Sequence, residues 1–186
     1  TLISRDGRIS VTGDIPASVP LDRGMLAAIE SLIGLYRSPI IPDLPPLQGG
    51  IMGYLGYDVV REVEHLPNAP HDVRDMPDAI MSVIGSLAAF DHWRQRVYLI
   101  ESVPVLGLSA DEIDAAYDSA CDRVEQAVSL LSRPLAYAPV PPPDPSDKPP
   151  VLKSSMPDGL YQRAVEVAKE YIRSGDIFQV VLAQRF

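Results

Sequence analysis

Two polar side chains near the end of the sequence, Gln179 and Arg185, have the types and the spacing that could hold a ligand. They belong to a mainly apolar run, residues 177–186, which favours a β-strand. Because strand residues alternate between faces, Gln179 and Arg185 would share one face and could look into a polar cavity. The structural alternative is that Gln179 is hydrogen-bonded inside a sheet and Arg185 lies at its edge, as buried polar groups are usually satisfied.

Three evenly spaced glycines, at positions 50, 53 and 56, raise the question of a phosphate-binding loop. A dinucleotide site needs a different glycine spacing between a strand and a helix, and a P-loop ends in Gly-Lys followed by Ser or Thr. The stretch 49–58 meets neither requirement. We therefore interpret these glycines as positions where a neighbouring backbone approaches a buried strand closely.

Other titratable residues give weaker indications of chemistry. His65 and His71 have no cysteine or further histidine at the spacing of metal ligands, which argues against a metal site. Glu62 and Glu64 lie in a short charged run, which is more typical of a solvated surface than of acid–base catalysis. Cys121, the single cysteine, lies in a helical pattern and is interpreted as a small buried hydrophobe.

These residues must be positioned by a mixture of helices and strands. The sequence predicts a β-hairpin over 1–12 with Asp6-Gly7 at its turn, and a second hairpin made of 79–90 and 97–103. Apolar residues at helical spacing predict helices over 21–36, 109–133 and 155–174. Ser109 and Glu112 match a capping box, and Gly175 is suited to end the last helix in a left-handed conformation.

Composition sets the organisation and the class of the protein. Seven prolines between residues 139 and 150 predict a semi-rigid linker over 139–153, between a subdomain over 1–138 and the start of another over 154–186. The net charge of −9 argues against nucleic acid or an anionic membrane as a partner. A lone cysteine, with no signal peptide or membrane-length apolar stretch, favours a reduced, cytoplasmic setting. The chain lacks an initiating Met and ends within a strand pattern, so we expect a piece of a longer protein.

Three segments resemble one enzyme family. Residues 175–186, GDIFQVVLAQRF, resemble the GD-I/L-F/Y-Q-V-x-L-S/A-Q-R-F segment of the chorismate-utilising enzymes. Residues 49–58, GGIMGYLGYD, with Arg61-Glu62 and Leu66-Pro67 after them, are the second match, and Phe90-Asp91-His92 before 97–100 is the third. The chain is most similar to the large subunit, component I, of anthranilate synthase and to its relative aminodeoxychorismate synthase component I.

The resemblance implies an α+β fold, an antiparallel β-sandwich with peripheral helices, of which this chain holds only part. It implies amination of chorismate and elimination of pyruvate to give anthranilate in tryptophan biosynthesis. The implied cofactor is Mg²⁺, which holds the carboxylate of chorismate. The implied partners are a glutamine amidotransferase subunit, which supplies ammonia, and tryptophan as a feedback inhibitor. The Mg²⁺ ligands and the chorismate-binding residues are implied to lie outside this chain.

The resemblance also implies a role for Gln179. In family members that add water to chorismate, a lysine stands at the matching position and acts as a base. An amide has no accessible protonation change, whereas ammonia already carries its lone pair and needs only positioning. Gln179 therefore favours an ammonia-using enzyme. Ala183 keeps aminodeoxychorismate synthase open as an alternative, and a non-catalytic module that binds the glutaminase partner is another.

Overall fold

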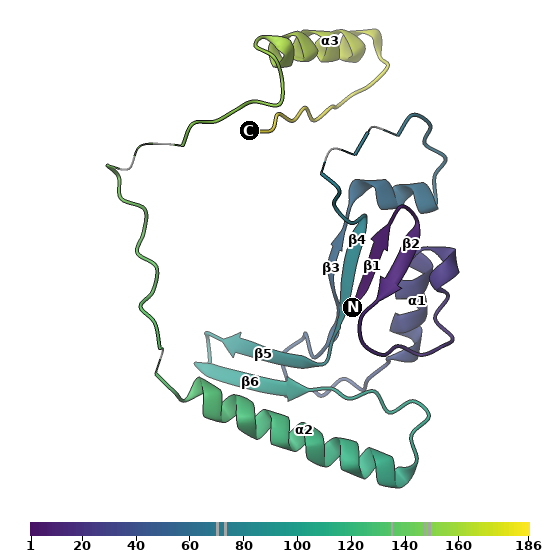
Figure 1. Ribbon diagram of the computed structural model, residues 1–186, viewed down its shortest axis with the longest axis vertical. Coiled ribbons are helices and arrows are strands. Elements are labelled where there is room, and N and C mark those ends of the chain that lie inside the picture. Colours follow the sequence, from purple (N-terminus) through teal and green to yellow (C-terminus); the bar gives the residue numbers. More distant parts are fainter. Residues whose placement is uncertain (70, 73, 135, 147, 149) are drawn as a thin grey trace. The chain divides into compact units, whose positions relative to one another are not determined.

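The computed structural model describes residues 1–186 except 70, 73, 135, 147 and 149 (Figure 1). The chain divides into two compact units, Thr1–Leu135 and Ala136–Phe186, and each is described by itself. The described residues of the first unit form antiparallel sheets with helices, and those of the second form one helix with irregular segments on either side. The subdomain boundaries at 138 and 153 stay a prediction.

A tight hairpin opens the first unit, as the Asp6-Gly7 signal predicts. Strand β1 (Leu2–Arg5) pairs with β2 (Arg8–Val11) in antiparallel register. Asp6 and Gly7 have φ angles of 47° and 71°. Two consecutive positive φ angles give the turn whose twist matches that of the flanking strands. The predicted hairpin is therefore confirmed.

Four strands form the larger sheet, in the order β2-β1-β4-β3. Strand β4 (Ala79–Ile84) lies between β1 and β3 (Gly50–Leu55), and all pairs are antiparallel. Strand β3 is thus an edge strand, and its side chains Met52 and Tyr54 are 56% and 39% exposed. The prediction of a buried strand at 49–58 is wrong, because most residues of β3 are exposed, and among the residues that the structure describes β3 pairs with β4 alone.

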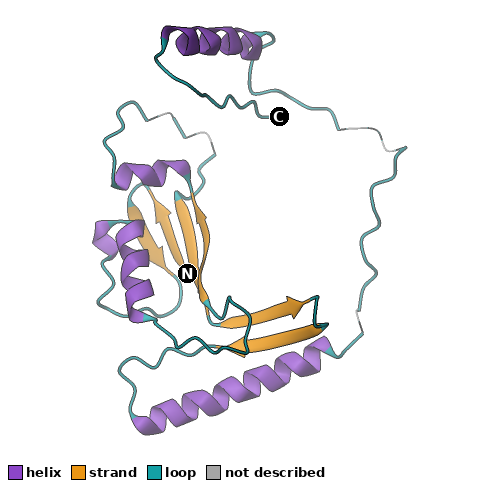
Figure 2. Ribbon diagram, turned by 180° about the vertical axis from the view of Figure 1, so that it is seen from behind, coloured by secondary structure: helices purple, strands orange, loops and turns teal. Residues whose placement is uncertain are grey.

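Helix α1 (Met25–Leu35) lies along one side of this sheet (Figure 2) and supplies much of the core. The short 3-10 helix η1 (Leu21–Arg23) precedes it, so the helix predicted over 21–36 is interrupted at Gly24, whose φ is 92°. Another 3-10 helix, η2 (Tyr57–Glu62), packs against the same core through Val59. Burial of each large apolar side chain contributes about 1.5–3 kcal/mol. The buried apolar residues of this core are Leu2, Val19, Met25, Ala28, Leu32, Val59 and Ala79.

The apolar run 79–90 forms two strands of different sheets rather than one strand. Gly85 separates β4 from β5 (Ser86–Asp91), and β5 pairs with β6 (Arg96–Glu101) in a two-stranded sheet. A Cβ on Gly85 would lie 2.9 Å from the carbonyl oxygen of Ser102, so a larger residue would crowd the backbone here. The predicted hairpin turn at 91–94 is confirmed, and the single strand over 79–90 is wrong.

Helix α2 (Ala110–Leu131) packs along β6. Its capping box is confirmed, since Glu112 N–H donates to Ser109 Oγ (3.4 Å) and Ser109 N–H donates to Glu112 Oε2 (2.8 Å). Ala120 is buried, whereas Cys121 is exposed. The prediction that Cys121 is buried is wrong, because one residue is about 100° around a helix and turns Cys121 away from β6. No helix in the described ranges has both the length and the apolar character to cross a membrane.

The second unit contains α3 (Leu160–Ser174), which begins later than the predicted residue 155. The strand predicted over 177–186 is wrong, because these residues form no regular structure. Strand residues need a neighbouring strand for their ladder hydrogen bonds. The described part of this unit offers no other strand to pair with them.

Candidate functional site

Gly175 directs the chain from α3 into the segment that carries Gln179. It is left-handed, with φ 83° and ψ 11°. Its N–H donates to Ile172 O (3.2 Å), and the Asp176 N–H donates to Tyr171 O (3.0 Å). These two bonds make up a Schellman motif, so the predicted helix end is confirmed.

The far end of this segment is tied to the residues that precede α3. Gln184 Nε2 donates to Ser154 Oγ at 2.6 Å. Ser155 N–H donates to Arg185 O (2.8 Å), and Arg185 N–H donates to Ser155 Oγ (3.2 Å). Both serines lie several residues before α3, so neither caps it, and its N-cap residue Gly159 has no capping side chain.

Gln179 itself is exposed between these two anchored ends. Its side chain forms no hydrogen bond with any residue that the structure describes. Phe178 and Val181 beside it are 94% and 82% exposed, whereas Leu182 and Gln184 are half-buried. The predicted polar face shared by Gln179 and Arg185 is not formed, because the segment lacks the pleat of a strand. The role of Gln179 stays a prediction.

Glu62, interpreted from the sequence as a solvated side chain, has a structural role. Its carboxylate accepts hydrogen bonds from the backbone N–H groups of Met25 (2.7 Å) and Leu26 (2.9 Å). These are unpaired donors at the N-terminus of α1, where negative charge is favourable. The N-cap residue, Gly24, has no side chain for this task. That missing cap was a signal in the sequence, but nothing in it pointed to a partner 37 residues away.

The glycines of the 49–58 motif allow close approach of backbone segments. A Cβ on Gly53 would lie 1.8 Å from Ile80 O, and one on Gly56 would lie 2.8 Å from Asp78 O. The Gly56 N–H donates to the same Asp78 oxygen at 2.7 Å. These contacts support the close-approach interpretation of the glycines. Across the described ranges, no three His, Cys, Asp or Glu side chains gather in a way that could hold a metal ion.

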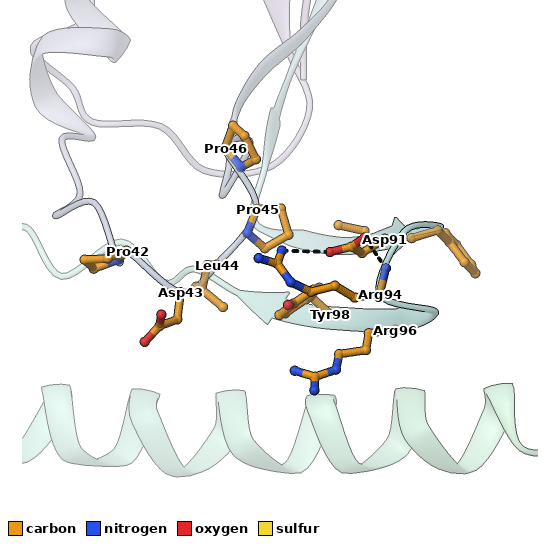
Figure 3. A pocket seen from close by; sticks show the side chains of 11 residues that line it. Pro42, Asp43, Leu44, Pro45, Pro46, Asp91, Arg94, Arg96 and Tyr98 are labelled. Carbon is orange, nitrogen blue, oxygen red and sulfur yellow. Dashed lines mark hydrogen bonds and ion pairs between the residues drawn. The ribbon is translucent and has the colours of Figure 1, made fainter.

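A groove of about 510 Å³ lies between the proline-rich residues 42–46 and the β5–β6 hairpin (Figure 3). Within it, Arg94 Nη1 lies 3.2 Å from Asp91 Oδ2, and the Arg94 N–H donates to Asp91 Oδ1 at 2.9 Å. The hydrogen bond from this backbone N–H, assisted by the guanidinium, lowers the pKa of Asp91 below its usual value. Tyr98 and Arg96 also line the groove.

Comparison with known proteins identifies the family of this chain. Residues 27–186 match the model of a family described as chorismate binding enzyme. The chain belongs to this family. Anthranilate synthase component 1 of Cereibacter sphaeroides is 38% identical over 187 residues, which cover 99% of this chain and 35% of that protein. The component 1 of Acetivibrio thermocellus is 33% identical over 166 residues, 84% of this chain and 32% of that protein.

Among solved structures, anthranilate synthase component I from Streptococcus pneumoniae TIGR4 has a similar fold, with a TM-score of 0.70 at 24% identity. The match covers 98% of this chain and 38% of that one. It confirms the predicted α+β fold class, and the curated relatives confirm the resemblance to component I. This chorismate binding enzyme chain spans about a third of the length of those relatives.

Proposed function

We propose that this chain is the N-terminal part of the chorismate-binding component of a cytoplasmic anthranilate synthase. The identity of 38% to an anthranilate synthase component 1, along nearly the whole chain, carries the proposal. The reaction is lyase chemistry, in which chorismate is aminated and pyruvate is eliminated to give anthranilate. It belongs to tryptophan biosynthesis.

In this proposal, Gln179 orients the ammonia that attacks chorismate. An amide offers both donors and an acceptor and stays neutral, so it can position ammonia without protonating it. The Schellman motif at Gly175 and the bond between Gln184 and Ser154 anchor the segment on both sides of Gln179. The exposed side chain is accessible to a ligand.

Other components of the reaction are proposed to come from outside this chain. A glutamine amidotransferase subunit supplies the ammonia, and tryptophan acts as the feedback inhibitor. The described residues do not fit Mg²⁺, because they contain no cluster of carboxylates or imidazoles able to hold a metal ion. We therefore assign no step of the reaction to a metal held by this chain.

The test uses the longer protein that extends past residue 186, with chorismate and ammonium ion as substrates and anthranilate fluorescence as the readout. Gln179→Ala should lower turnover about tenfold or more without changing the thermal midpoint, because positioning of the nucleophile is lost. Gln162→Ala, at an exposed position of α3, is the matched control and should leave turnover unchanged. If Gln179→Ala is as active as the parent, Gln179 has no positioning role.

Product analysis in the same assay tests the reaction itself. Accumulation of an aminated product that retains its pyruvate moiety would favour the aminodeoxychorismate synthase alternative, which Ala183 leaves open. An isomer of chorismate, in which a hydroxyl group from water stands in place of the amino group, would contradict both. Residues 1–186 alone should make no anthranilate, since they span about a third of the relatives' length. A partner-binding module without catalysis would be indicated if the longer protein bound the glutaminase yet formed no product.

A further inference from the structure

The segment that carries Gln179 is held at both ends by hydrogen bonds within the second unit. The Schellman motif at Gly175 fixes its start. Its far end returns beside the residues that precede α3 (Figure 1), where two neighbouring residues of one stretch bind two neighbouring residues of the other. We call this contact the serine clamp, made of Ser154, Ser155, Gln184 and Arg185.

The hydroxyl of Ser154 uses its full hydrogen-bonding capacity in the clamp. It donates to Met156 O (2.8 Å) and accepts from Met156 N–H (2.9 Å) and from Gln184 Nε2 (2.6 Å). A hydroxyl has one donor and two acceptor positions, so all three are occupied. The turn with Met156 fixes the oxygen, and the oxygen holds the Gln184 side chain in its half-buried position. Without this oxygen, the Gln184 amide would lose its partner in a place that is partly closed to water.

Ser155 holds the backbone of the next residue, Arg185, through two hydrogen bonds. Its N–H donates to Arg185 O (2.8 Å), and its hydroxyl accepts from Arg185 N–H (3.2 Å). Two such bonds also join a hydrogen-bonded residue pair of an antiparallel ladder, and here the hydroxyl stands in place of a carbonyl oxygen. The clamp therefore fixes both the position and the direction of the chain at residues 184–185.

The middle of the segment depends on these two ends. Phe178 and Val181 are almost fully exposed, and Gln179 forms no hydrogen bond with any residue that the structure describes. Packing thus does little to hold Gln179, whereas two fixed ends restrict where the short backbone between them can lie. A group that positions a nucleophile loses much of its effect when it is displaced by about 1 Å.

We propose that Ser154 is a positioning residue for the amination of chorismate. Its hydroxyl, assisted by Ser155, fixes the far end of the segment so that Gln179 is oriented toward the ammonia. This inference rests on the proposed function. Ser154 does not touch the reacting atoms and acts through Gln184 on Gln179. A clamp that only stabilised the fold would affect turnover whichever residue stood at position 179.

The test uses the longer protein that extends past residue 186, with chorismate and ammonium ion as substrates. Ser154→Ala should lower kcat about tenfold and leave KM for chorismate unchanged, because nucleophile positioning acts on the transition state. Ser154→Thr keeps the hydroxyl and should restore most of the turnover. Gln184→Met removes the same bond with a side chain of similar size and should match Ser154→Ala. Ser146→Ala, the control, removes a hydroxyl that bonds to Asp144 in the same unit and should be as active as the parent.

A double-mutant cycle separates positioning from stability. If Ser154 acts through Gln179, Ser154→Ala should cost nothing further in a protein that already carries Gln179→Ala. All rates are measured well below the lowest Tm among the variants, so that unfolding does not contribute. If Ser154→Ala does not fold, Gln184→Met takes its place in the cycle.

Three results would overturn the role of Ser154. They are a Ser154→Ala enzyme as active as the parent, a Ser154→Thr enzyme as slow as Ser154→Ala, and an equal loss from Ser154→Ala with and without Gln179→Ala. In each of these cases an impaired Gln179→Ala enzyme would leave the proposed function intact. If Gln179→Ala is itself fully active, the positioning roles of Gln179 and Ser154 are both refuted.

Discussion

The carboxylate of Glu62 occupies the space that a side chain on Gly24 would fill. A Cβ on Gly24 would lie 2.7 Å from the Glu62 carboxyl carbon, and the φ of 92° at Gly24 also disfavours any other residue. The glycine leaves room for the carboxylate, and the carboxylate caps the helix that the glycine cannot cap. The Glu62 side chain therefore connects the motif at 49–62 to helix α1.

Glu62→Ala should lower the free energy of unfolding by about 1 kcal/mol, the usual cost of losing a helix N-cap. Urea unfolding followed by circular dichroism measures it. Glu64→Ala is the matched control, because Glu64 lies in the same charged stretch and its carboxylate has no partner among the described residues. Equal stability of the two variants would show that the bonds to Met25 and Leu26 contribute nothing.

Gly53→Ala should destabilise the larger sheet by about 3 kcal/mol, because the added methyl group would overlap the backbone of β4 at Ile80. Gly34→Ala provides the contrast. Gly34 lies in α1 with nothing within 4 Å of an added Cβ, so alanine should stabilise the helix by about 0.5–1 kcal/mol. Thermal unfolding of both variants measures the difference, and shifts of the same sign would contradict the close-approach interpretation.

The pair formed by Glu101 and Arg123 should make stability depend on pH. Burial opposes ionisation of Glu101, but hydrogen bonds from Ser86 and Arg123 together with the charge of Arg123 outweigh it, so the pKa of Glu101 is lowered from 4.5. Since the folded-state pKa lies below the unfolded one, the stabilisation is present above about pH 4.5 and is lost as the pH falls through the folded-state pKa.

Arg123→Gln should therefore lower the Tm near neutral pH and have little effect in strong acid. Arg173→Gln removes an exposed ion pair with Glu170, whose side chains are 65% and 71% exposed, and should change the Tm little at any pH. If the Tm of Arg123→Gln lay below that of the parent by the same amount at all pH values, the role of Glu101 ionisation would be refuted.

Features encoded by adjacent residues were predictable from the sequence. Asp6-Gly7 formed the expected turn, Ser109 and Glu112 formed the expected cap, and Gly175 ended α3 as expected. Each of these depends on backbone angles or hydrogen bonds within a few residues. Local chemistry is therefore enough to specify them.

Features that depend on a distant neighbour were not predictable. Residues 177–186 have strand-forming side chains, but a strand exists only where another strand accepts its hydrogen bonds. Cys121 is exposed because of which side of α2 meets β6, and the cap of α1 came from Glu62, far along the chain. For the candidate site, the motif singled out Gln179, but what its side chain faces is decided by residues beyond its own segment.

Strand β3 has a further consequence for how the isolated chain behaves in solution. Its residues Gly50–Leu55 include no charged side chain and no proline, the two features that usually protect a sheet margin from pairing with another molecule. The other edge strand of the sheet, β2, carries the charged residue Arg8. At high concentration we expect copies of the chain to associate through β3, and Met52→Lys should delay the turbidity that such association produces.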